Sequence, residues 1–321
     1  ISKVVIVACG TAAYAGEIAR YAIEKWARLS VAVELAHEFR YRDPVIDAGT
    51  LVIAISQSGE TMDTLMATRY AKEHGAKVLA VCNTQGATLA RESDAVLYTH
   101  AGPEVAVAST KALVAQITAG LLIALYLADV RGAQPAAELQ RLGLELLKLP
   151  AKVTETIAIA KIGEQLGETF KDAKSVLFLG RNVGFPVAME GALKLKELAY
   201  IHAEGFAAGE LKHGPIALID QGQPVIVIVP SPNAPDSLNA KVVSNIQEIR
   251  ARGARVIAIA EQGDQSVADF VEQVIYLPST EQLLAPVLQV IPLQVFAMAL
   301  ASAKGLDVDQ PRNLAKSVTV E

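Results

Sequence analysis

The sequence contains the stretch Thr50-Leu-Val-Ile-Ala-Ile-Ser56-Gln57-Ser58-Gly59-Glu60-Thr61. Its five consecutive apolar residues, 51–55, are followed by a short polar turn that contains a glycine. A continuous apolar run of this kind is typical of a strand buried on both faces, as in parallel sheets covered by helices. A helical pattern begins at Thr61. The stretch therefore predicts a strand, a turn and a helix of an α/β fold.

Similar apolar runs recur along the chain and alternate with helical patterns. The predicted strands are residues 3–8, 50–55, 77–82, 95–99, 175–179, 224–229, 255–260 and 273–277. The predicted helices are residues 14–27, 61–74, 111–127, 186–200, 237–252 and 283–303. Strands that alternate with helices form βαβ units and doubly wound layers. We therefore predict mostly parallel sheets with helices on both faces, a three-layer αβα arrangement.

The two halves of the chain repeat the same order of elements. Val-Leu-Ala-Val after Gly75-Ala76-Lys77 is matched 178 residues later by Val-Ile-Ala-Ile after Gly253-Ala254-Arg255. Each half ends in one long uncharged helical stretch. We predict two tandem α/β domains, residues 1–150 and 151–306, with the boundary near Pro150 and a C-terminal tail at 307–321.

Composition excludes several classes of protein. Of the 321 residues, 52% are hydrophobic, which excludes an intrinsically disordered chain. The net charge of −5 and the aromatic content of 5% argue against nucleic-acid binding. Cys9 and Cys82 cannot build a disulfide framework or a four-cysteine zinc site, so we expect free thiols in a reducing compartment, the cytoplasm. No metal and no cofactor are expected.

Two uncharged stretches, 112–128 and 282–303, are long enough to raise the question of a membrane span. Both contain glutamine, and the second contains two prolines, so buried core helices are the favoured interpretation and no membrane partner is expected. The start of the chain has no signal-peptide pattern. Because it begins with Ile1 instead of Met, we expect the sequence to be part of something longer.

The polar turn at residues 56–61 is a candidate phosphate site. It places hydroxyl and backbone N–H groups at the start of a helix, where oriented N–H groups and the helix dipole attract anions. Open α/β sheets bind ligands at this edge. No lysine follows Gly59, which argues against a P-loop NTPase. The alternative is an ordinary helix cap, although four hydroxyl or amide residues in six exceed what one cap needs.

A second turn, Ala8-Cys9-Gly10-Thr11, follows the first predicted strand in the same way. It is interpreted equally well as part of the same pocket or as a plain connection between a strand and a helix.

Ionisable groups gather in the second half of the chain. Glu190, Lys194 and Glu197 share one face of a predicted helix. Solvated ion pairs, each worth ~0.3–0.5 kcal/mol, are the alternative interpretation. The run 202–215 then ends in His213 before Gly-Pro, and a loop histidine can exchange protons with a substrate oxygen near neutral pH.

The chain end supplies a possible amine nucleophile. Lys316 lies five residues before the last residue, where a lysine is normally solvated. If the tail docks over the cleft, Lys316 becomes a candidate imine-forming amine, provided that desolvation lowers its pKa.

These motifs resemble the isomerase half of the glutamine–fructose-6-phosphate aminotransferase (isomerizing) family, the glucosamine-6-phosphate synthases. The resemblance covers essentially the whole chain. It rests on Ala-Cys9-Gly-Thr, Glu38-Phe-Arg-Tyr-Arg42, Ser56-Gln-Ser-Gly-Glu-Thr61, Cys82-Asn-Thr, Ala106-Val-Ala-Ser109-Thr-Lys111, residues 190–215 and the terminal Asp309-Gln-Pro-Arg-Asn-Leu-Ala-Lys-Ser-Val-Thr-Val-Glu321. It implies two tandem sugar-isomerase (SIS) subdomains.

The resemblance also implies roles for individual residues. The sugar phosphate and sugar would be bound by Cys9, Gly10, Thr11, Ser56, Gln57, Ser58, Thr61, Val107, Ala108 and Ser109. Lys316 matches the lysine that forms an imine with the open ketose, and Glu197 the base that moves a proton between C1 and C2, with Lys194 nearby. His213 matches the ring-opening histidine, which in this family acts from the neighbouring subunit of a homodimer.

The implied reaction converts fructose 6-phosphate and ammonia into glucosamine 6-phosphate, for UDP-N-acetylglucosamine biosynthesis. Two departures from the family pattern matter. Ala12 stands where the family usually has Ser, and the N-terminal glutaminase domain, which supplies the ammonia, is absent from these residues. We therefore expect no glutamine hydrolysis by this stretch. Glucose 6-phosphate is a further expected ligand.

Two other functions remain open from the sequence. A simple aldose–ketose phosphate isomerase or a sugar-phosphate deaminase would work without the imine of Lys316. A non-catalytic sugar-phosphate sensor would need none of Glu197, His213 and Lys316.

Overall fold

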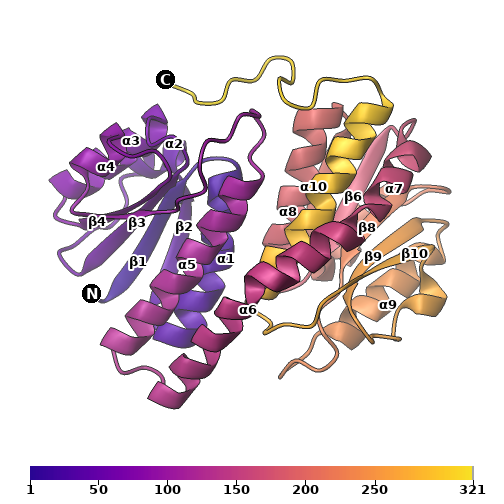
Figure 1. Cartoon of the computed structure of the whole chain (residues 1–321), viewed down its shortest axis with the longest axis horizontal. Coiled ribbons are helices and arrows are strands. Elements are labelled where there is room, and N and C mark those ends of the chain that lie inside the picture. Colours follow the sequence, from indigo (N-terminus) through magenta and orange to yellow (C-terminus); the bar gives the residue numbers. More distant parts are fainter. Residues whose placement is uncertain (320–321) are drawn as a thin grey trace. The chain divides into compact units, whose positions relative to one another are not determined.

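The computed structural model describes residues 1–319, and its chain forms two compact units (Figure 1). The first unit is Ile1–Gln140 together with the chain end from Asn313, and the second is Arg141–Arg312. The predicted boundary near Pro150 falls inside one long helix, α6 (Ala136–Ala160), which also contains the division between the units. The last two residues of the predicted tail 307–321, and of its family motif, lie outside the described residues.

The first unit is built on a five-stranded sheet in the order β2-β1-β3-β4-β5, and every adjacent pair is parallel. Its strands are β1 (Lys3–Ala8), β2 (Ser30–Leu35), β3 (Thr50–Ser56), β4 (Lys77–Cys82) and β5 (Ala95–Tyr98). Its helices are α1 (Thr11–Ala22), the π-helix η1 (Ile23–Ala27), α2 (Ala36–Phe39), the 3-10 helix η2 (Arg40–Arg42), α3 (Met62–Glu73), α4 (Thr88–Glu92) and α5 (Lys111–Val130).

Helices cover both faces of this sheet, because strand residues alternate between the two faces. Val5, Val52 and Val78 point into a cluster with Leu65 of α3 and Leu89 of α4. On the other face, α1 approaches β1 so closely that a Cβ on Gly16 would lie 2.8 Å from the side chain of Ile6. The predicted three-layer arrangement is confirmed for this unit.

The second unit repeats this architecture with the sheet order β10-β9-β8-β6-β7, again all parallel. Its strands are β6 (Ser175–Gly180), β7 (His202–Ala207), β8 (Pro224–Ile228), β9 (Arg255–Glu261) and β10 (Gln273–Leu277). Besides α6, its helices are α7 (Ile162–Phe170), α8 (Gly184–Ala199), α9 (Asn239–Arg250) and α10 (Ala285–Ala303), with the 3-10 helices η3 (Ala208–His213), η4 (Pro215–Leu218) and η5 (Ala268–Phe270).

The two sheets correspond strand by strand, which confirms the predicted fold of two tandem copies. In each sheet, the first strand along the chain is flanked by the second strand on one side and by the third on the other. The fourth strand pairs with the third, and the fifth pairs with the fourth. The turn after the first strand also corresponds: Gly10 has φ of 54° and Asn182 has φ of 53°. Glycine and asparagine are the residues that adopt this left-handed region at least cost.

The sequence reasoning missed two strands, β2 and β7, and both lie at an edge of their sheet. Ser30–Leu35 begins and ends with an exposed residue, and only the second residue of His202–Ala207 is buried. An edge strand does not need the continuous apolar run that marks a strand covered on both faces. Residues 202–207, for which no element was predicted, therefore form a strand, and the predicted loop histidine, His213, ends a short 3-10 helix.

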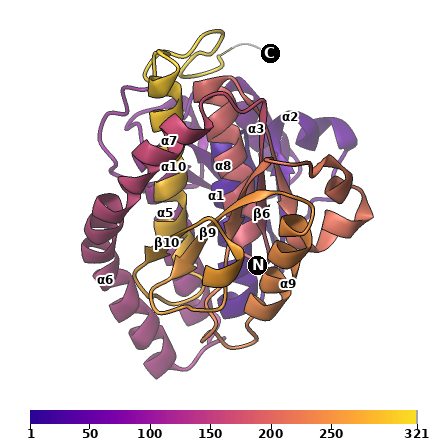
Figure 2. The ribbon, with the colours of Figure 1, turned by 90° about the vertical axis from the view of Figure 1, so that its right-hand side faces the viewer.

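The two long apolar helices are α5 and α10, and both have the length and composition of a membrane span. Each also packs within its own unit, α5 against α1 and α10 against α7 and α8 (Figures 1 and 2). Small residues allow close approach: a Cβ on Gly120 of α5 would lie 2.6 Å from that of Ala19, and one on Gly167 of α7 only 2.7 Å from the backbone of α10. This packing is that of core helices.

Replacing Gly167 with alanine tests the α7–α10 contact. Because the added Cβ meets backbone atoms of Ala299 and Leu300 at 2.7 Å, we expect Gly167→Ala to lower the free energy of unfolding by ~1–3 kcal/mol. The matched control is Gly143→Ala in α6, where nothing lies within 4 Å, and alanine should stabilise the helix by ~0.5–1 kcal/mol. Urea denaturation measures both changes, and equal stability of the two variants would contradict the packing.

Candidate functional site

The candidate phosphate loop, residues 56–61, joins the carboxyl end of β3 to the start of α3. The hydroxyl of Ser56 accepts a hydrogen bond from the N–H of Gly59 (3.0 Å) and lies 3.3 Å from the hydroxyl of Thr61. Ser58 Oγ accepts a hydrogen bond from the N–H of Glu60 (3.2 Å). Hydrogen bonds to the hydroxyl groups of Ser56 and Ser58 therefore hold the loop in a turn at the start of α3.

A glycine is required at position 59. Its φ of 68° lies in the left-handed region, and a Cβ there would lie 2.6 Å from the Cβ of Ala87 and 2.7 Å from the Sγ of Cys82. The carbonyl of Gly59 also accepts a hydrogen bond from the N–H of Leu89 (3.0 Å). This close approach ties the loop to the segment after β4.

Glu60 and Gln57 also hold the loop against the segment after β4. The N–H of Thr88 donates to Glu60 Oε1 (2.7 Å), and this hydrogen bond lowers the pKa of the Glu60 carboxyl. The N–H groups of Asn83 and Thr84 donate to the carbonyl of Gln57 at 3.2 and 3.3 Å. The loop is therefore anchored on its β4 side before any ligand arrives.

The companion turn Cys9-Gly10-Thr11 connects β1 to the first residue of α1. The thiol of Cys9 lies 4.0 Å from the hydroxyl of Thr64 in α3, and burial raises the pKa of this thiol. A raised pKa keeps the sulfur protonated at neutral pH, so Cys9 is not an activated nucleophile. Gly10 supplies the positive φ of the turn.

The chain end docks on the candidate phosphate loop within the first unit. Ser317 Oγ lies 3.1 Å from Ser58 Oγ, and the carbonyl of Val318 accepts a hydrogen bond from the N–H of Met62 (3.1 Å). Met62 is the first residue of α3, so the tail carbonyl satisfies one of the helix's free N–H groups. Residues 317 and 318 thereby hold the neighbouring Lys316 beside the loop.

Lys316 contacts the segment before α5. Its Nζ donates a hydrogen bond to the carbonyl of Ala106 (2.7 Å) and lies 3.7 Å from Glu104 Oε2. The side chain of Glu104 is only 3% exposed. An amine and a buried carboxylate are thus brought together next to the candidate phosphate loop.

Glu104 also caps the start of α5. It accepts hydrogen bonds from the N–H of Thr110 (2.8 Å), the hydroxyl of Thr110 (3.0 Å), the hydroxyl of Ser109 (3.2 Å) and the N–H of Ala112 (3.4 Å). Burial raises the pKa of this carboxyl, but the Thr110 hydrogen bond and the charge of Lys316 outweigh it, so the net pKa is lowered. Glu104 is therefore a charged, buried carboxylate.

The sequence reasoning missed Glu104. Its only signal is that it is the single acidic residue in the stretch before the long uncharged helix, and carboxylates favour helix starts. Of the three predicted sugar contacts in this segment, Ser109 donates to Glu104, Ala108 is buried, and Val107 is half-buried. Glu104 therefore shapes the whole of residues 104–110.

In the second unit, α8 carries the predicted acid–base cluster. Lys194 Nζ lies 3.5 Å from Glu190 Oε1 and donates a hydrogen bond to Glu197 Oε2. Glu190 and Lys194 are each 1% exposed, whereas the side chain of Glu197 is 22% exposed. The alternative of solvated ion pairs is therefore wrong, and Glu197 is the member of the cluster that is open to a ligand.

Lys194 is a buried cation held between two carboxylates. Burial lowers its pKa, but the charges of Glu190 and Glu197 outweigh the burial, and the net pKa is raised. Lys194 therefore stays an ammonium and orients the carboxylate of Glu197. It is not a neutral nucleophile.

His213 lies at the end of η3, on a different element from α8. Its side chain is exposed, and Gly214, with φ of 138°, ends the helix. Leu211 is buried beneath η3, and Lys212 Nζ pairs with Glu248 of α9 at 2.8 Å. The segment is thus anchored while the imidazole stays accessible.

The part of the chain that the structure describes, residues 1–319, contains no group of three His, Cys, Asp or Glu side chains placed to hold a metal ion. The chemistry available there is that of amines, carboxylates, hydroxyls and an imidazole.

Known proteins match this chain in both sequence and structure. The SIS domain family matches residues 1–126 and 169–303. The chain belongs to the SIS domain family.

Whole-chain relatives are more specific than this match. The chain is 67% identical over 321 residues to the glutamine–fructose-6-phosphate aminotransferase [isomerizing] of Leifsonia xyli subsp. xyli and 64% identical to that of Corynebacterium glutamicum. Each match covers 100% of this chain and 52% of the relative, so the chain spans about half the length of these curated relatives.

Solved structures agree with this placement. The C-terminal domain of glucosamine-fructose-6-phosphate aminotransferase from Francisella tularensis superposes with a TM-score of 0.91 at 40% identity, over 97% of this chain and 87% of that one. Glucosamine-6-phosphate deaminase from Thermotoga maritima has a TM-score of 0.81 at 22% identity, over 99% and 91%, which shows the shared fold alone. The resemblance stated from the sequence motifs is confirmed.

The two SIS matches correspond to the two units, and they leave out the tail that carries Lys316. The aminotransferase relatives align with the chain over its whole length, tail included. The tail thus lies outside the SIS matches and inside the alignment with these relatives. Ala12, the residue expected to depart from the family pattern, is the second residue of α1.

Removing the buried ammonium of Lys194 should destabilise the second SIS unit. Lys194→Met leaves the carboxylate of Glu190 buried without its cation, which costs ~3–5 kcal/mol of unfolding free energy. Adding Glu190→Gln removes the buried charge and should recover most of that loss. Urea denaturation at pH 7 measures both.

Measuring the free energy of unfolding at a series of pH values supplies the control. Because the pKa of Lys194 is raised above 10.5 in the folded state, its stabilising effect is complete at lower pH and is lost as the pH rises through the folded value. Wild type should therefore lose more stability in alkali than Lys194→Met does. A cost below ~1 kcal/mol for Lys194→Met, as for a surface pair, would contradict the burial.

Proposed function

We propose that this chain is the sugar-converting part of a glucosamine-6-phosphate synthase. It binds fructose 6-phosphate and, with ammonia, converts it to glucosamine 6-phosphate, a step towards UDP-N-acetylglucosamine. The observation that carries the proposal is the docking of the tail on the candidate phosphate loop. Through Ser317 and Val318 it sets the amine of Lys316 beside the loop, within the first unit.

The phosphate of the sugar binds at residues 56–61, assisted by Thr11 and the turn Cys9–Gly10. Two features support this: the loop starts a helix at the carboxyl end of β3, and its conformation is fixed in advance by hydrogen bonds to the segment after β4. Holding the phosphate end positions C1 and C2 without weakening the chemistry there. Val107, Ala108 and Ser109 line the sugar on the side that Glu104 shapes.

Lys316 is the amine that attacks C2 of the open ketose. Loss of water then gives an imine. The contact of Lys316 with Ala106 and Glu104 fixes where this amine waits, and Glu104 is a positioning residue because its carboxylate holds both Lys316 and the start of α5. Exchange with ammonia leaves nitrogen on C2 and frees Lys316.

Glu197 moves the proton that converts the ketose skeleton to an aldose. It takes a proton from C1 of the C2 imine and returns it to C2, while the proton of the C1 hydroxyl passes to the nitrogen, which leaves an aldehyde at C1 and an amine at C2. Its partial exposure and its orientation by Lys194 support this role. His213 exchanges the proton that opens the sugar ring, and we assign it to the site of the neighbouring subunit in a homodimer.

The ammonia comes from glutamine through the half of the relatives that lies outside this sequence. We place the reaction in the cytoplasm, in keeping with the two thiols, which are free. No nucleic acid and no membrane takes part. A simple phosphosugar isomerase, a deaminase and a non-catalytic sensor are the competing functions.

Trapping with borohydride tests the imine. Reduction in the presence of fructose 6-phosphate should leave a sugar adduct on Lys316, seen by peptide mass analysis. Lys316→Ala should lose the adduct and nearly all ammonia-dependent synthesis of glucosamine 6-phosphate, because no other amine is held at this position. Lys304→Ala, at the end of α10, is the matched control.

The competing functions give different results. Full activity of Lys316→Ala without any adduct would mean a plain isomerase or deaminase. Sugar-phosphate binding without turnover in wild type, even with ammonia, would mean a sensor.

Glu197→Gln separates binding from proton transfer. The variant keeps the size and the hydrogen-bonding capacity of the side chain but cannot act as the base, so turnover should fall by about 10²–10⁴-fold while sugar-phosphate affinity changes little. Steady-state kinetics and calorimetric titration measure the two quantities. Loss of binding together with a lower melting temperature would show that Glu197 is only structural.

A further inference from the structure

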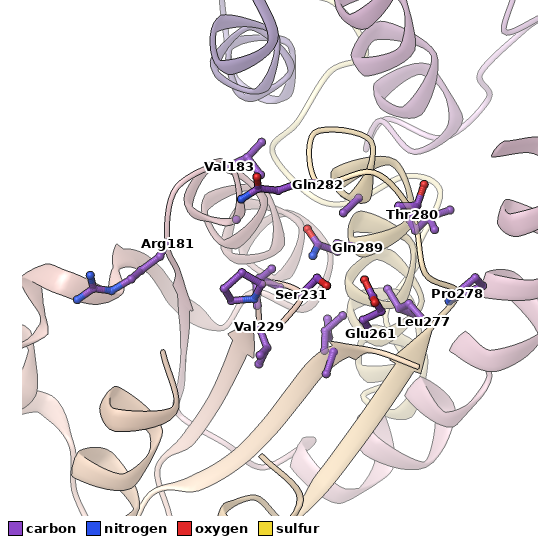
Figure 3. Close-up of a pocket in the computed structure, with 17 residues that line it drawn as sticks. Arg181, Val183, Val229, Ser231, Glu261, Leu277, Pro278, Thr280, Gln282 and Gln289 are labelled. Carbon is purple, nitrogen blue, oxygen red and sulfur yellow. The ribbon is translucent and has the colours of Figure 1, made fainter. Parts of the chain in front are cut away.

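The second unit has its own pocket, at the carboxyl ends of β8, β9 and β10 and the starts of α8 and α10 (Figure 3). Its cavity volume, the space open to the centre of a water-sized molecule, is about 40 Å³, and its mouth opens to solvent. Because the two sheets correspond strand by strand, this is the position that the ends of β3, β4 and β5 occupy in the first unit. Open α/β sheets bind ligands at this edge.

The chemistry of this pocket differs from that of the candidate phosphate loop. After β8 the chain reads Val229-Pro230-Ser231-Pro232-Asn233, in place of the serine- and glycine-containing turn after β3. The two prolines have no N–H to offer an anion. Glu261, at the end of β9, adds a negative charge, and Arg181 directs its guanidinium away from the pocket (Figure 3). A phosphate is therefore disfavoured here.

Two polar atoms that line the pocket lack hydrogen-bond partners within residues 1–319, and one of them is a pure acceptor. Gln289 Oε1 and Thr280 Oγ1 are buried and have no hydrogen-bond partner among the described residues. Glu261 likewise makes no described salt bridge, and Figure 3 shows its carboxylate, Ser231 and Gln289 around one space. Unpaired buried acceptors are costly, and a ligand that donates hydrogen bonds removes the cost.

The remaining lining is apolar, with Ile228, Val229, Leu277 and Leu288 as the walls. Such walls favour a ligand with a short apolar body, and the carboxylate favours a cationic head. We propose that this pocket binds a small organic ammonium compound, a primary amine whose ammonium pairs with Glu261 and donates to Gln289. The proposal does not rest on the proposed function, since all of these residues belong to the second unit.

Titration with 1-butylamine, which is protonated at neutral pH, tests the proposal against 1-butanol, which has the same apolar body without the charge. Calorimetry and saturation-transfer NMR on the whole chain should show at least about tenfold tighter binding of the amine, the advantage of a charge-assisted hydrogen bond. Glu261→Gln should abolish that advantage. Gln289→Leu should weaken amine binding more than alcohol binding, because the ammonium makes the stronger, charge-assisted hydrogen bond.

The matched control is Glu164→Gln, which removes the same charge from an exposed position on α7 and should change nothing. Melting temperatures confirm that each variant is folded. Equal affinity for amine and alcohol, amine binding that survives Glu261→Gln, or no amine binding at any concentration the folded protein tolerates would each overturn the proposal.

Discussion

Parallel strand pairing is the constraint on which the rest of this structure depends. In each unit every strand runs the same way, so all five carboxyl ends open at one edge and each following helix starts there. That edge gathers helix N–H groups and loop side chains from segments far apart in the sequence. In the first unit, the loops after β1 and β3, the segment before α5 and the docked tail are the parts on which the proposed sugar site is built.

Two buried carboxylate–lysine contacts stand out against the apolar cores. Both charges of the Glu190–Lys194 pair are withdrawn from water, as is the carboxylate of Glu104 beside the partly exposed Lys316, and replacing buried pairs with apolar residues is often neutral or stabilising. Core stability alone therefore does not account for them. These contacts position functional groups. Glu104 holds the amine of Lys316 in place, and Lys194 orients the carboxylate of Glu197.

The elements with the plainest apolar patterns were predictable from the sequence. The eight predicted strands and the six predicted helices all exist, with ends shifted by a few residues. The strands β2 and β7 were not predictable in this way, because at a sheet edge half of the side chains need not be apolar. Burial of Lys194 was equally hidden, since spacing on a helix sets which residues share a face but not what covers that face.

The candidate site was predictable only in parts. The turn at residues 56–61 has a local signature, because its hydroxyl residues and glycine act through their own backbone. The contact of Glu104 with Lys316 joins residues more than 200 positions apart, and no local pattern encodes such a pairing. The role proposed for Lys316 follows from the resemblance to a known family. The contact of Glu104 with Lys316 is seen only in the structure.

Duplication explains why one chain carries two such edges with different chemistry. The fold constrains what the copies share, the positive φ at Gly10 and Asn182 and the parallel register, because these hold each sheet and its first helix together. The residues after the third strand differ between the copies. One copy there has serines and a glycine, and the other has prolines facing a carboxylate. The proposed ligands follow this difference, with a phosphate assigned to the edge that carries serines and a glycine and an ammonium to the edge that carries a carboxylate.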